Sequence, residues 1–365
     1  MSLATLTSAA ECVQLETIKA CPVCSSETHL ELYETHDWLY GLPGEFKLSR
    51  CNDCGVIYLS ERPTRQSIGF YYPFDSYYSY VRPASYSLFW RRDIVSSFWY
   101  FVKKSILAHQ YNYRHLGGSK SVSLLARALF MRPLRTRATF QLDVLLHPYI
   151  RGGSLLEVGC GSGMYLDLMR GLGWSRVVGV DISARAIQQA KEVLGIEAYC
   201  GNLEDAPFEA SSFDAVSLSH TLEHMPEPMA FLREVNRVMK SGGRIAVIVP
   251  NIDSRGAREF GAHWFHLDSP RHTVNFSRGS LRLALERAGF RVESLKTNPR
   301  GAYQTALLSY CRKAGDDHSI HTAAKPGYPL NRRAQALFLS LIERIECVIG
   351  LQTGEEILAV ARKPR

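Results

Sequence analysis

The sequence predicts an α/β protein, with a doubly wound parallel sheet in its C-terminal part and a small cysteine-rich segment before it. Three observations support this. From about residue 150 onward, apolar runs that read as buried strands alternate with amphipathic helical patterns. A glycine-rich turn joins the first of these strands to its helix. Two C-x2-C pairs lie close to the N-terminus, where no such alternation is seen.

The glycine-rich turn predicts a nucleoside pocket. Gly159, Gly161 and Gly163 follow a buried strand at 155–158, and a helix is expected from about 164 to 172. Glycines let the backbone approach a ligand closely and adopt positive φ, and the helix directs its positive N-terminal end at the bound molecule. The next strand, 177–181, ends at Asp181. Its carboxylate can accept hydrogen bonds from both ribose hydroxyls.

The rest of this half continues the alternation. Serine caps at Ser183 and Ser277 predict two helix starts. In chain order we expect a helix at 183–194, a strand and turn at 197–204, a strand at 213–219, a helix at 228–239 stopped by Ser241-Gly242-Gly243, strands at 244–249 and 290–295 with a helix at 277–288 between them, and a late strand at 356–361.

The glycine spacing indicates which nucleoside is bound. A dinucleotide fingerprint would read G-x-G-x-x-G, whereas here Glu157 stands two residues before a G-x-G-x-G run. This pattern resembles motif I of the class I S-adenosylmethionine-dependent methyltransferases. The resemblance covers about residues 150–365 and implies a Rossmann-like sheet of seven strands, with 356–361 as the antiparallel seventh. For the glycines alone, an NAD site or a ligand-free turn is the alternative.

The resemblance also implies a set of cofactor-binding residues. Asp181 falls at the family's ribose-binding position, and Asn202 stands where the family usually has an acid against the adenine amine. An amide oxygen can still accept a hydrogen bond from that amine. The full set expected at the cofactor is Glu157, Gly159, Gly161, Gly163, Asp181, Ile182, Asn202, Leu203 and Ser219.

The paired cysteines predict a structural zinc site. Cys21 and Cys24 form one C-x2-C pair, and Cys51 and Cys54 form the other. This spacing is typical of two tight knuckles that hold a tetrahedral zinc ion, whose four thiolates leave no position open for substrate. A redox role is less favoured, because neither pair opens a helix of a βαβ unit. So small a ribbon can bury little core, and the metal would substitute for one.

We therefore expect three parts: a zinc ribbon at 1–60, a helical and aromatic region at 61–148, and the cofactor-binding domain at 149–365. Helices are expected at about 86–108, 119–130 and 135–148. In the family that the sequence resembles, segments upstream of motif I commonly form a lid over the substrate. An insertion at about 297–353, with a helix at 331–351, shapes the acceptor site or forms a homodimer contact.

The catalytic residues are expected where the fourth strand ends. The run His220-x-x-Glu223-His224 lies in a loop at the edge that holds donor and acceptor in this fold. Its Leu-Glu-His signature resembles the ubiquinone-type O-methyltransferases. A histidine is the natural base for removing a hydroxyl proton. Some relatives carry Glu-x-x-Glu-His as a divalent-metal site, and His220 replaces the first acid here. Two alternatives stay open for Glu223 and His224: a metal site, or a role in capping the loop.

A second group of histidines follows the fifth strand. His272, in a Pro-x-His segment before Phe-Ser, is the second candidate base, because the segment resembles one that covers the active site in the same methyltransferase branch. We expect His263 and His266 to line or close the pocket. Arg271 is expected either to bind a phosphate or carboxylate of the substrate or to form an ordinary surface ion pair.

Composition bounds the partners. The chain has 365 residues, 46% hydrophobic and 21% charged, with a net charge of +8, so it is globular throughout. An apolar stretch at 85–108 is interrupted by charges and cannot span a membrane, although it suits peripheral contact with a membrane surface. Nine cysteines behind a polar N-terminus without a signal peptide argue against a disulfide framework and for a cytoplasmic protein.

Taken together, the chain resembles bacterial zinc-ribbon methyltransferases of glycan and secondary-metabolite biosynthesis. We expect S-adenosylmethionine-dependent O-methylation of a sugar, a lipid-linked glycan or a phenolic small molecule, with His224 or His272 as base and Glu223 beside them. One alternative is an RNA methyltransferase, which the ribbon disfavours because residues 21–54 hold six acids against two Lys or Arg. The other is a non-catalytic interaction protein with the same fold.

Overall fold

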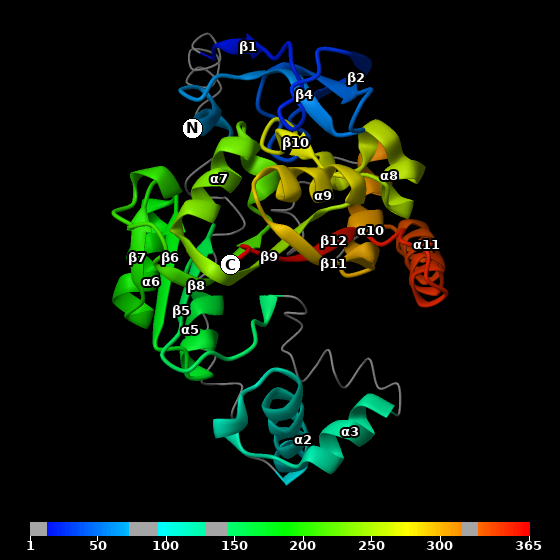
Figure 1. Ribbon diagram of the computed structural model, residues 1–365. Helices are drawn as coiled ribbons and strands as arrows, with labels where there is room; N and C mark the ends of the chain where they lie inside the picture. Colours follow the sequence, from blue (N-terminus) through cyan, green and yellow to red (C-terminus); the bar gives the residue numbers. More distant parts are fainter. Residues whose placement is uncertain (1–12, 73–93, 129–144, 316–327) are drawn as a thin grey trace. The chain divides into compact units, whose positions relative to one another are not determined.

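The computed structural model describes residues 13–72, 94–128, 145–315 and 328–365 (Figure 1). Two compact units can be distinguished within the chain. One comprises Met1–Tyr78, His220–Arg233 and Ile248–Ala359. The other comprises Ser79–Ser219, Glu234–Val247 and Val360–Arg365. None of the helices in the described parts is both long and apolar enough to cross a membrane.

The main sheet has seven strands, as predicted. Its order is β11 (Arg291–Asn298), β12 (Glu356–Arg362), β9 (Met239–Pro250), β8 (Phe213–Ser219), β5 (Ser154–Val158), β6 (Arg176–Asp181) and β7 (Glu197–Cys200). Strand β5 is parallel to β6 and β8, and β6 is parallel to β7. The last strand, β12, runs antiparallel to β9, because Gly242 is bonded to Lys363 near one end and Asn251 to Glu355 near the other.

Strand β9 is longer than predicted. We expected Ser241-Gly242-Gly243 to stop a helix before a strand at 244–249, but this segment is already extended. Gly242 N–H donates to Lys363 O, and Lys363 N–H donates to Gly243 O, at 2.9 and 3.0 Å. The two glycines therefore serve the pairing of β9 with the end of β12, a partner more than 100 residues away that the local sequence does not reveal.

The helices that follow the strands begin where their caps predict. Helix α5 spans Met164–Gly171 and α6 spans Ala184–Leu194. Ser183 Oγ accepts a hydrogen bond from Ala186 N at 3.1 Å, which caps α6. Helix α7 is Pro228–Val238, and α9 is Arg278–Arg287, which starts with a capping box between Ser277 and Ser280.

The aromatic region contains fewer described helices than expected. Helix α2 spans Ile94–Gln110 and α3 spans Lys120–Ala128, close to two of the three predictions. Most of the third, at 135–148, lies outside the described residues, and its described end, 145–148, is not α-helical. Two helices occupy the predicted insertion: α10 (Ala302–Lys313) and α11 (Leu330–Val348), which confirms the helix expected at 331–351.

The ribbon forms a second, antiparallel sheet with the order β1 (Leu15–Thr17), β4 (Ile57–Pro63), β3 (Glu45–Cys51) and β2 (His29–His36). Strand β10 (Val274–Asn275) also pairs with β4. One buried cluster combines Phe46, Leu48 and Leu59 of the ribbon with Trp264, with α8 (Arg255–Phe260), and with α10 and α11. Within its unit the ribbon therefore shares a core with the segment that carries the second histidine group.

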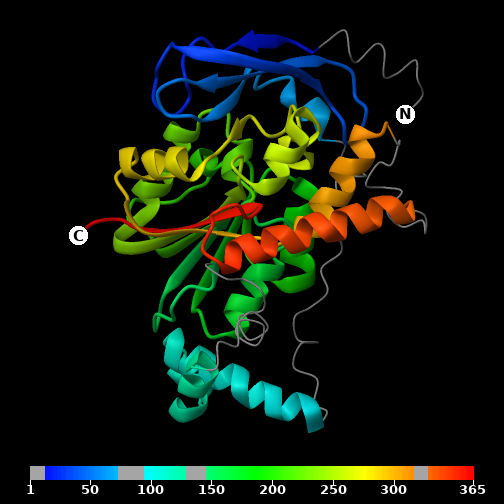
Figure 2. The ribbon, with the colours of Figure 1, turned by 90° about the vertical axis from the view of Figure 1, so that its right-hand side faces the viewer.

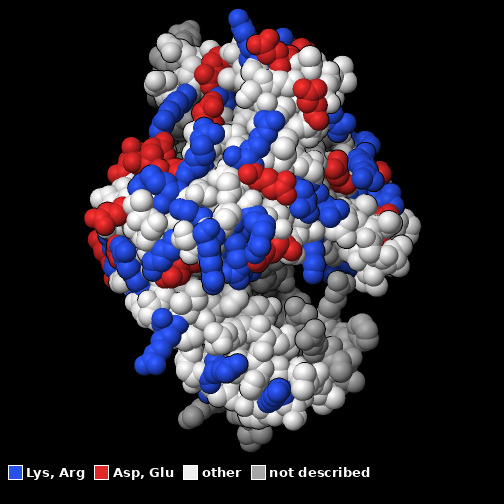
Figure 3. Space-filling model, viewed as in Figure 1, with Lys and Arg blue, Asp and Glu red and all other residues white. Residues whose placement is uncertain are grey.

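Charges of both signs are mixed on the molecular face of Figure 3. Lysine and arginine side chains alternate there with aspartate and glutamate over most of the described surface. A continuous basic band, of the kind that tracks a nucleic-acid backbone, is not seen among the described residues on this face.

Candidate functional site

The glycine-rich turn has the backbone geometry that its sequence predicts. Gly159, Gly161 and Gly163 all have positive φ, between +50° and +80°. At Gly163, whose φ is +80°, an added Cβ would lie only 3.1 Å from Ala190 Cβ. The turn therefore depends on residues without side chains, and it leaves the backbone open to a ligand at the carboxyl ends of β5 and β6.

Two acids flank this turn. Asp181 accepts hydrogen bonds from Gly161 N–H and Ser183 N–H, each at 2.8 Å, so its carboxylate is held at the end of β6. Glu157 is 4% exposed, and its Oε2 has no hydrogen-bond partner. Burial, and then the charge of Asp181, raise the pKa of Glu157 well above its usual value. A buried carboxyl oxygen without a partner requires a hydrogen-bond donor, which the amino or hydroxyl groups of S-adenosylmethionine can provide.

The other predicted cofactor residues surround the same turn. Asn202 donates through Nδ2 to Asp205 Oδ2 at 2.9 Å, which leaves its amide oxygen as an acceptor. Leu203 is buried, whereas Ile182 is 56% exposed directly after Asp181. Ser219 is the last residue of β8, the parallel neighbour of β5. These residues would suit a nucleoside, because an amide acceptor and apolar side chains accompany the carboxylate of Asp181.

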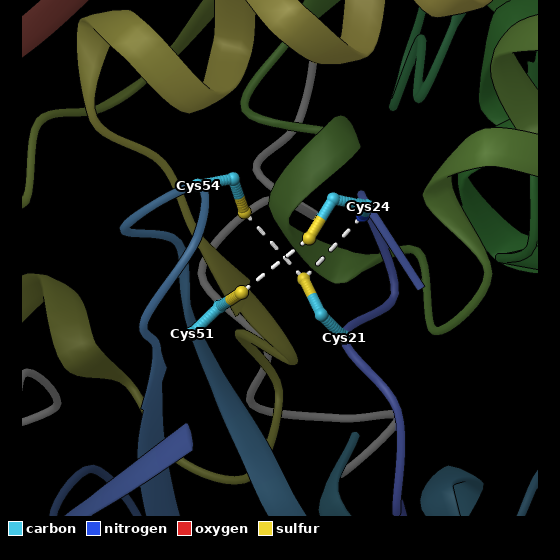
Figure 4. A group of neighbouring side chains, drawn as sticks. All are labelled: Cys21, Cys24, Cys51 and Cys54. Atoms are coloured by element: carbon cyan, nitrogen blue, oxygen red, sulfur yellow. Dashed lines mark hydrogen bonds between the residues drawn. The ribbon is translucent and has the colours of Figure 1, made fainter. Parts of the chain in front are cut away.

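The four paired cysteines converge on one point (Figure 4). Cys21 Sγ lies 3.6 Å from Cys54 Sγ, and Cys24 Sγ lies 3.4 Å from Cys51 Sγ. All four sulfur atoms are within 4.8 Å of one another. Sulfur atoms bound to one tetrahedral zinc ion at 2.3 Å stand about 3.8 Å apart. The spacing of the sulfur atoms therefore fits that ion closely.

The thiols also need a counter-charge. The hydrogen bond from Cys54 lowers the pKa of Cys21 to about 5, and the same contact raises the pKa of Cys54. Burial raises the pKa of Cys24 to about 11. The protein alone thus accommodates a thiolate at Cys21 but not four thiolates together. A divalent cation at the centre would remove that conflict, because metal binding deprotonates its thiol ligands.

The two candidate bases lie side by side. The rings of His224 and His272 are 4.6 Å apart between centroids. His224 Nδ1 is 3.1 Å from Arg271 O, and His272 Nδ1 is 2.7 Å from His266 O. A carbonyl oxygen can only accept, so Nδ1 of His272 carries a proton. Nδ1 of His224 lies 3.1 Å from the Tyr72 hydroxyl as well as from Arg271 O, so it can donate to the carbonyl or accept from the hydroxyl. Burial, and then His272, lower the pKa of His224 to about 4. At neutral pH His224 is therefore uncharged.

Glu223 lies next to both histidines. A ligand atom of each of Glu223, His224 and His272 falls within 4.8 Å of the others. Glu223 is 1% exposed, and neither carboxylate oxygen has a hydrogen-bond partner, although His220 Nδ1 is 3.2 Å from Oε1. Burial would raise the pKa of Glu223, but His220 outweighs it and lowers that pKa to about 2. Two imidazole lone pairs beside one carboxylate also make a ligand set for a divalent metal ion.

His220 is a cation rather than a base. It lies between two acids, with Nδ1 3.2 Å from Glu223 and Nε2 3.3 Å from Glu356. Burial lowers the pKa of His220, but the two carboxylates overcome this and raise it to about 10. Its φ of +51° is unusual for a residue other than glycine. Strain of this kind collects at functional sites.

Arg271 is unavailable to a substrate, contrary to both expectations for it. Its side chain is 0% exposed, and it donates to Asp268 at 2.7 and 3.0 Å, to Asp37 at 2.7 Å and to Tyr71 O at 3.0 Å. Asp37 belongs to the ribbon and Asp268 to the loop before His272. The arginine thus joins these two segments, and β10, paired with β4, joins them again just after His272.

Arg312 is the cation that sequence reasoning missed. It lies on α10, is 9% exposed, and donates to Trp264 O at 3.0 Å. Its guanidinium carbon is 5.7 Å from the Trp38 ring centroid and 5.4 Å from that of Phe265. Within the described chain no carboxylate lies at ion-pair distance from it. Burial lowers the pKa of Arg312 to about 10. The local sequence of α10 gives no sign of this environment.

The other two histidines predicted to line the pocket, His263 and His266, lie beside Arg312. His263 packs edge-on against Trp38 at 5.5 Å between centroids, and its Nδ1 is buried without a partner. His266 stacks on His220 at 6.4 Å, and its Nε2 is 3.1 Å from Thr305 Oγ1. Burial, then the charge of His220, lower the pKa of His266 to about 3. His266 therefore connects the surroundings of Arg312 with those of the candidate bases.

Known proteins share the central part of the chain. Residues 131–295 match the family model described as a methyltransferase domain. The ubiquinone biosynthesis O-methyltransferase of Albidiferax ferrireducens is 29% identical over 218 residues, covering 55% of this chain and 75% of the relative. The demethylmenaquinone methyltransferase of Lactococcus lactis is 36% identical over 107 residues, covering 27% of this chain and 42% of the relative.

Among solved structures, a methyltransferase in complex with the Haloferax volcanii activator Trm112 aligns with a TM-score of 0.45 and 22% identity, covering 66% of this chain and 94% of that one. The family model includes the glycine-rich turn, Asp181 and the Glu223–His224 pair, and it also reaches His272. Residues 131–295 therefore form a methyltransferase domain, and the chain is an S-adenosylmethionine-dependent methyltransferase.

Proposed function

We propose that the chain methylates a hydroxyl group of a small molecule, with a neutral histidine as general base. The observation that supports this most is the pair His224 and His272, whose rings lie 4.6 Å apart and whose Nδ1 atoms each lie within hydrogen-bond distance of a backbone carbonyl. The quinone-pathway names of two relatives support a small ring-containing acceptor. Phenolic acceptors fit best, and a sugar or lipid-linked glycan hydroxyl remains within the same chemistry.

The geometry supports a separate role for each group of the proposed site. S-adenosylmethionine supplies an electrophilic methyl group. His272 Nε2 takes the proton of the acceptor hydroxyl as that oxygen becomes nucleophilic. We assign the base to His272 rather than His224, because a pKa near 4 makes His224 a weak proton acceptor. Glu223 stabilises the imidazolium that forms, since its carboxylate is buried beside both histidines and is held ionised by His220, 3.2 Å away.

Arg312 supports a narrower substrate class. A buried guanidinium without a carboxylate at ion-pair distance is costly. Among the described residues, two aromatic rings and one carbonyl compensate the desolvation of its charge. We propose that an acidic group of the acceptor, a carboxylate or phosphate, completes its hydrogen bonds. Trp38 and Phe265 would then pack against the apolar part of the acceptor.

The first test is methyl transfer from labelled S-adenosylmethionine to 3,4-dihydroxybenzoate and to catechol, which differ in the carboxylate. Wild-type protein should prefer the acid, and Arg312→Met should remove the preference. His272→Gln should lower kcat at least 100-fold with unchanged binding of S-adenosylhomocysteine. His109→Gln, an exposed histidine of α2, is the matched control. Equal turnover by wild type and His272→Gln would refute the assignment of the base.

A metal-assisted reaction is the second candidate. Glu223, His224 and His272 would bind a divalent ion that orients two neighbouring acceptor oxygens. The observation in its favour is the buried carboxylate of Glu223, which lies within 4.8 Å of one ring nitrogen of each histidine. Dialysis against a chelator, followed by addition of Mg²⁺, distinguishes the two candidates once the ribbon is shown to keep its metal. Activity independent of added metal supports the general base.

Zinc in the ribbon is proposed to be structural, because four cysteine ligands close its coordination sphere. RNA as acceptor is not favoured, since the six acids in residues 21–54 would repel phosphates. A non-catalytic role would leave the glycine turn and the carboxylates at 157 and 181 without a purpose.

A further inference from the structure

Helix α11 has two apolar faces, and only one of them packs against other described residues of its own unit. Ala336, Leu339, Ser340 and Glu343 are buried, and the first two belong to the core that includes α10. Figure 2 shows α11 lying beside α10, with no described element drawn in front of it. Arg255 also bonds to Glu346 and holds the helix near its C-terminal end. The helix is therefore fixed on its unit along one side.

The opposite face exposes large apolar side chains along its whole length. We call it the α11 stripe: Leu337 (52% exposed), Phe338 (67%), Leu341 (49%), Ile345 (61%) and Val348 (71%). Phe338, Leu341, Ile345 and Val348 follow one another at intervals of three, four and three residues. This is the a/d spacing of a helix that packs knobs into holes against another helix.

The stripe is larger than a monomer normally leaves exposed. At roughly 200 Å² for a large apolar side chain, the exposed fractions correspond to on the order of 600 Å² for the stripe. Adding Leu330, Ile349 and Leu351, which are 80%, 69% and 48% exposed, brings the area to roughly 1,000 Å². A stable interface buries about 800 Å² on each partner, so this surface suffices.

We propose that the α11 stripe packs against the same stripe of a second copy of this chain, with the two helices antiparallel around a twofold axis near Leu341. A self-complementary patch on a twofold axis needs no other partner. A lipid surface is less well matched, because a helix that lies on a membrane presents a strongly charged face to water. The other face of α11 is instead occupied by its own protein, and Arg344 is the one Lys or Arg in the C-terminal half of α11.

The proposal does not depend on the reaction and is tested on the full zinc-loaded chain by sedimentation velocity. Wild-type protein should sediment at twice the 41.1 kDa chain mass. Ile345→Glu, which brings a charge into the centre of the interface, should weaken dimerisation at least 30-fold. Because Ile345 is exposed, the variant should keep the wild-type circular dichroism spectrum and unfolding midpoint.

Val193→Glu is the matched control, since Val193 is 62% exposed on α6, outside the stripe, and should leave the dimer unchanged. Flotation with vesicles of phosphatidylcholine and phosphatidylserine tests the lipid surface. A wild-type monomer at all concentrations would overturn the proposal. So would a dimer that Ile345→Glu leaves intact, or a monomer whose binding to vesicles requires Ile345.

Discussion

Replacing Arg271 with methionine should be among the most destabilising single changes in the chain. The guanidinium is fully buried and makes four hydrogen bonds of 2.7–3.0 Å to Asp268, Asp37 and Tyr71 O. Methionine fills similar space but leaves two buried carboxylates without their cation. Breaking a buried ion pair from one side costs about 3–5 kcal/mol.

The loss of stability should arise mainly from Asp268, which is left without its cation. Asp37 keeps three backbone donors, Leu39 N at 3.0 Å, Tyr40 N at 3.1 Å and Leu42 N at 3.4 Å, so it stays partly compensated. We therefore expect a loss near the lower end, about 3 kcal/mol at pH 7, measured as a shift of the urea midpoint at unchanged m. Arg282→Met, which removes an exposed ion pair of 3.4 Å to Glu286, should cost less than about 1 kcal/mol.

The loss of stability caused by Arg271→Met should also depend on pH. In wild-type protein, burial would raise the pKa of Asp268, but Arg271 outweighs it and holds that pKa below the usual 3.8. This stabilisation is complete above the unfolded-state pKa and is lost as the pH falls through the folded-state value. In the variant the unpaired acid can be neutralised by protonation, so the difference between the proteins should shrink from pH 7 toward pH 4. A loss below about 1 kcal/mol at pH 7, equal to that of Arg282→Met, would refute this account.

Three further outcomes are expected. Cys51→Ser should lower the zinc content from one ion per chain, as measured by elemental analysis, and should reduce turnover. The variant should still bind S-adenosylhomocysteine within about threefold of wild type, because the ribbon supports the His272 segment and not the glycine turn. Equal zinc content in both proteins would contradict this. Ser277→Ala should cost about 1 kcal/mol in urea unfolding, because it removes the capping box of α9, and no change would show that the cap is dispensable. Burial raises the pKa of Glu343 to about 7, so the stability of the wild-type protein should decline as the pH rises from about 4.5 to 7. Glu343→Gln keeps an acceptor for Glu355 N–H and should flatten that decline. Parallel pH profiles of the two proteins would argue against a raised pKa at Glu343.

Sequence reasoning succeeded where the chemistry is local. The glycine turn and the serine caps depend on residues within a few positions of one another, and the structure places them as expected. The two C-x2-C pairs, and Asp181 at the end of its strand, are short motifs that can be read from the sequence although their partners lie 20 or more positions away. The presence of seven strands, with the last one antiparallel, also followed from the alternation of strands and helices together with the family resemblance.

Sequence reasoning was wrong or silent where the partner is distant. Arg271 is bonded to Asp37, 234 positions away, so its neighbouring residues could not distinguish a substrate contact from a buried network. Arg312 lies at the end of α10, and its neighbours in the sequence do not indicate the rings of Trp38 and Phe265 that enclose its guanidinium. The glycines that read as a helix stop belong to β9, because Lys363 at the end of the chain pairs with them.

The most direct test of the central claim is calorimetric titration of the zinc-loaded protein with S-adenosylhomocysteine, comparing wild type with Asp181→Asn. Asparagine keeps one oxygen for Gly161 N–H but loses the charge that a ribose would meet. We predict micromolar binding by wild type and affinity at least 10-fold weaker in the variant, since hydrogen bonds to a charged group contribute about 1.5–3 kcal/mol. Folded wild-type protein that does not bind, or a variant that binds equally well, would contradict the account.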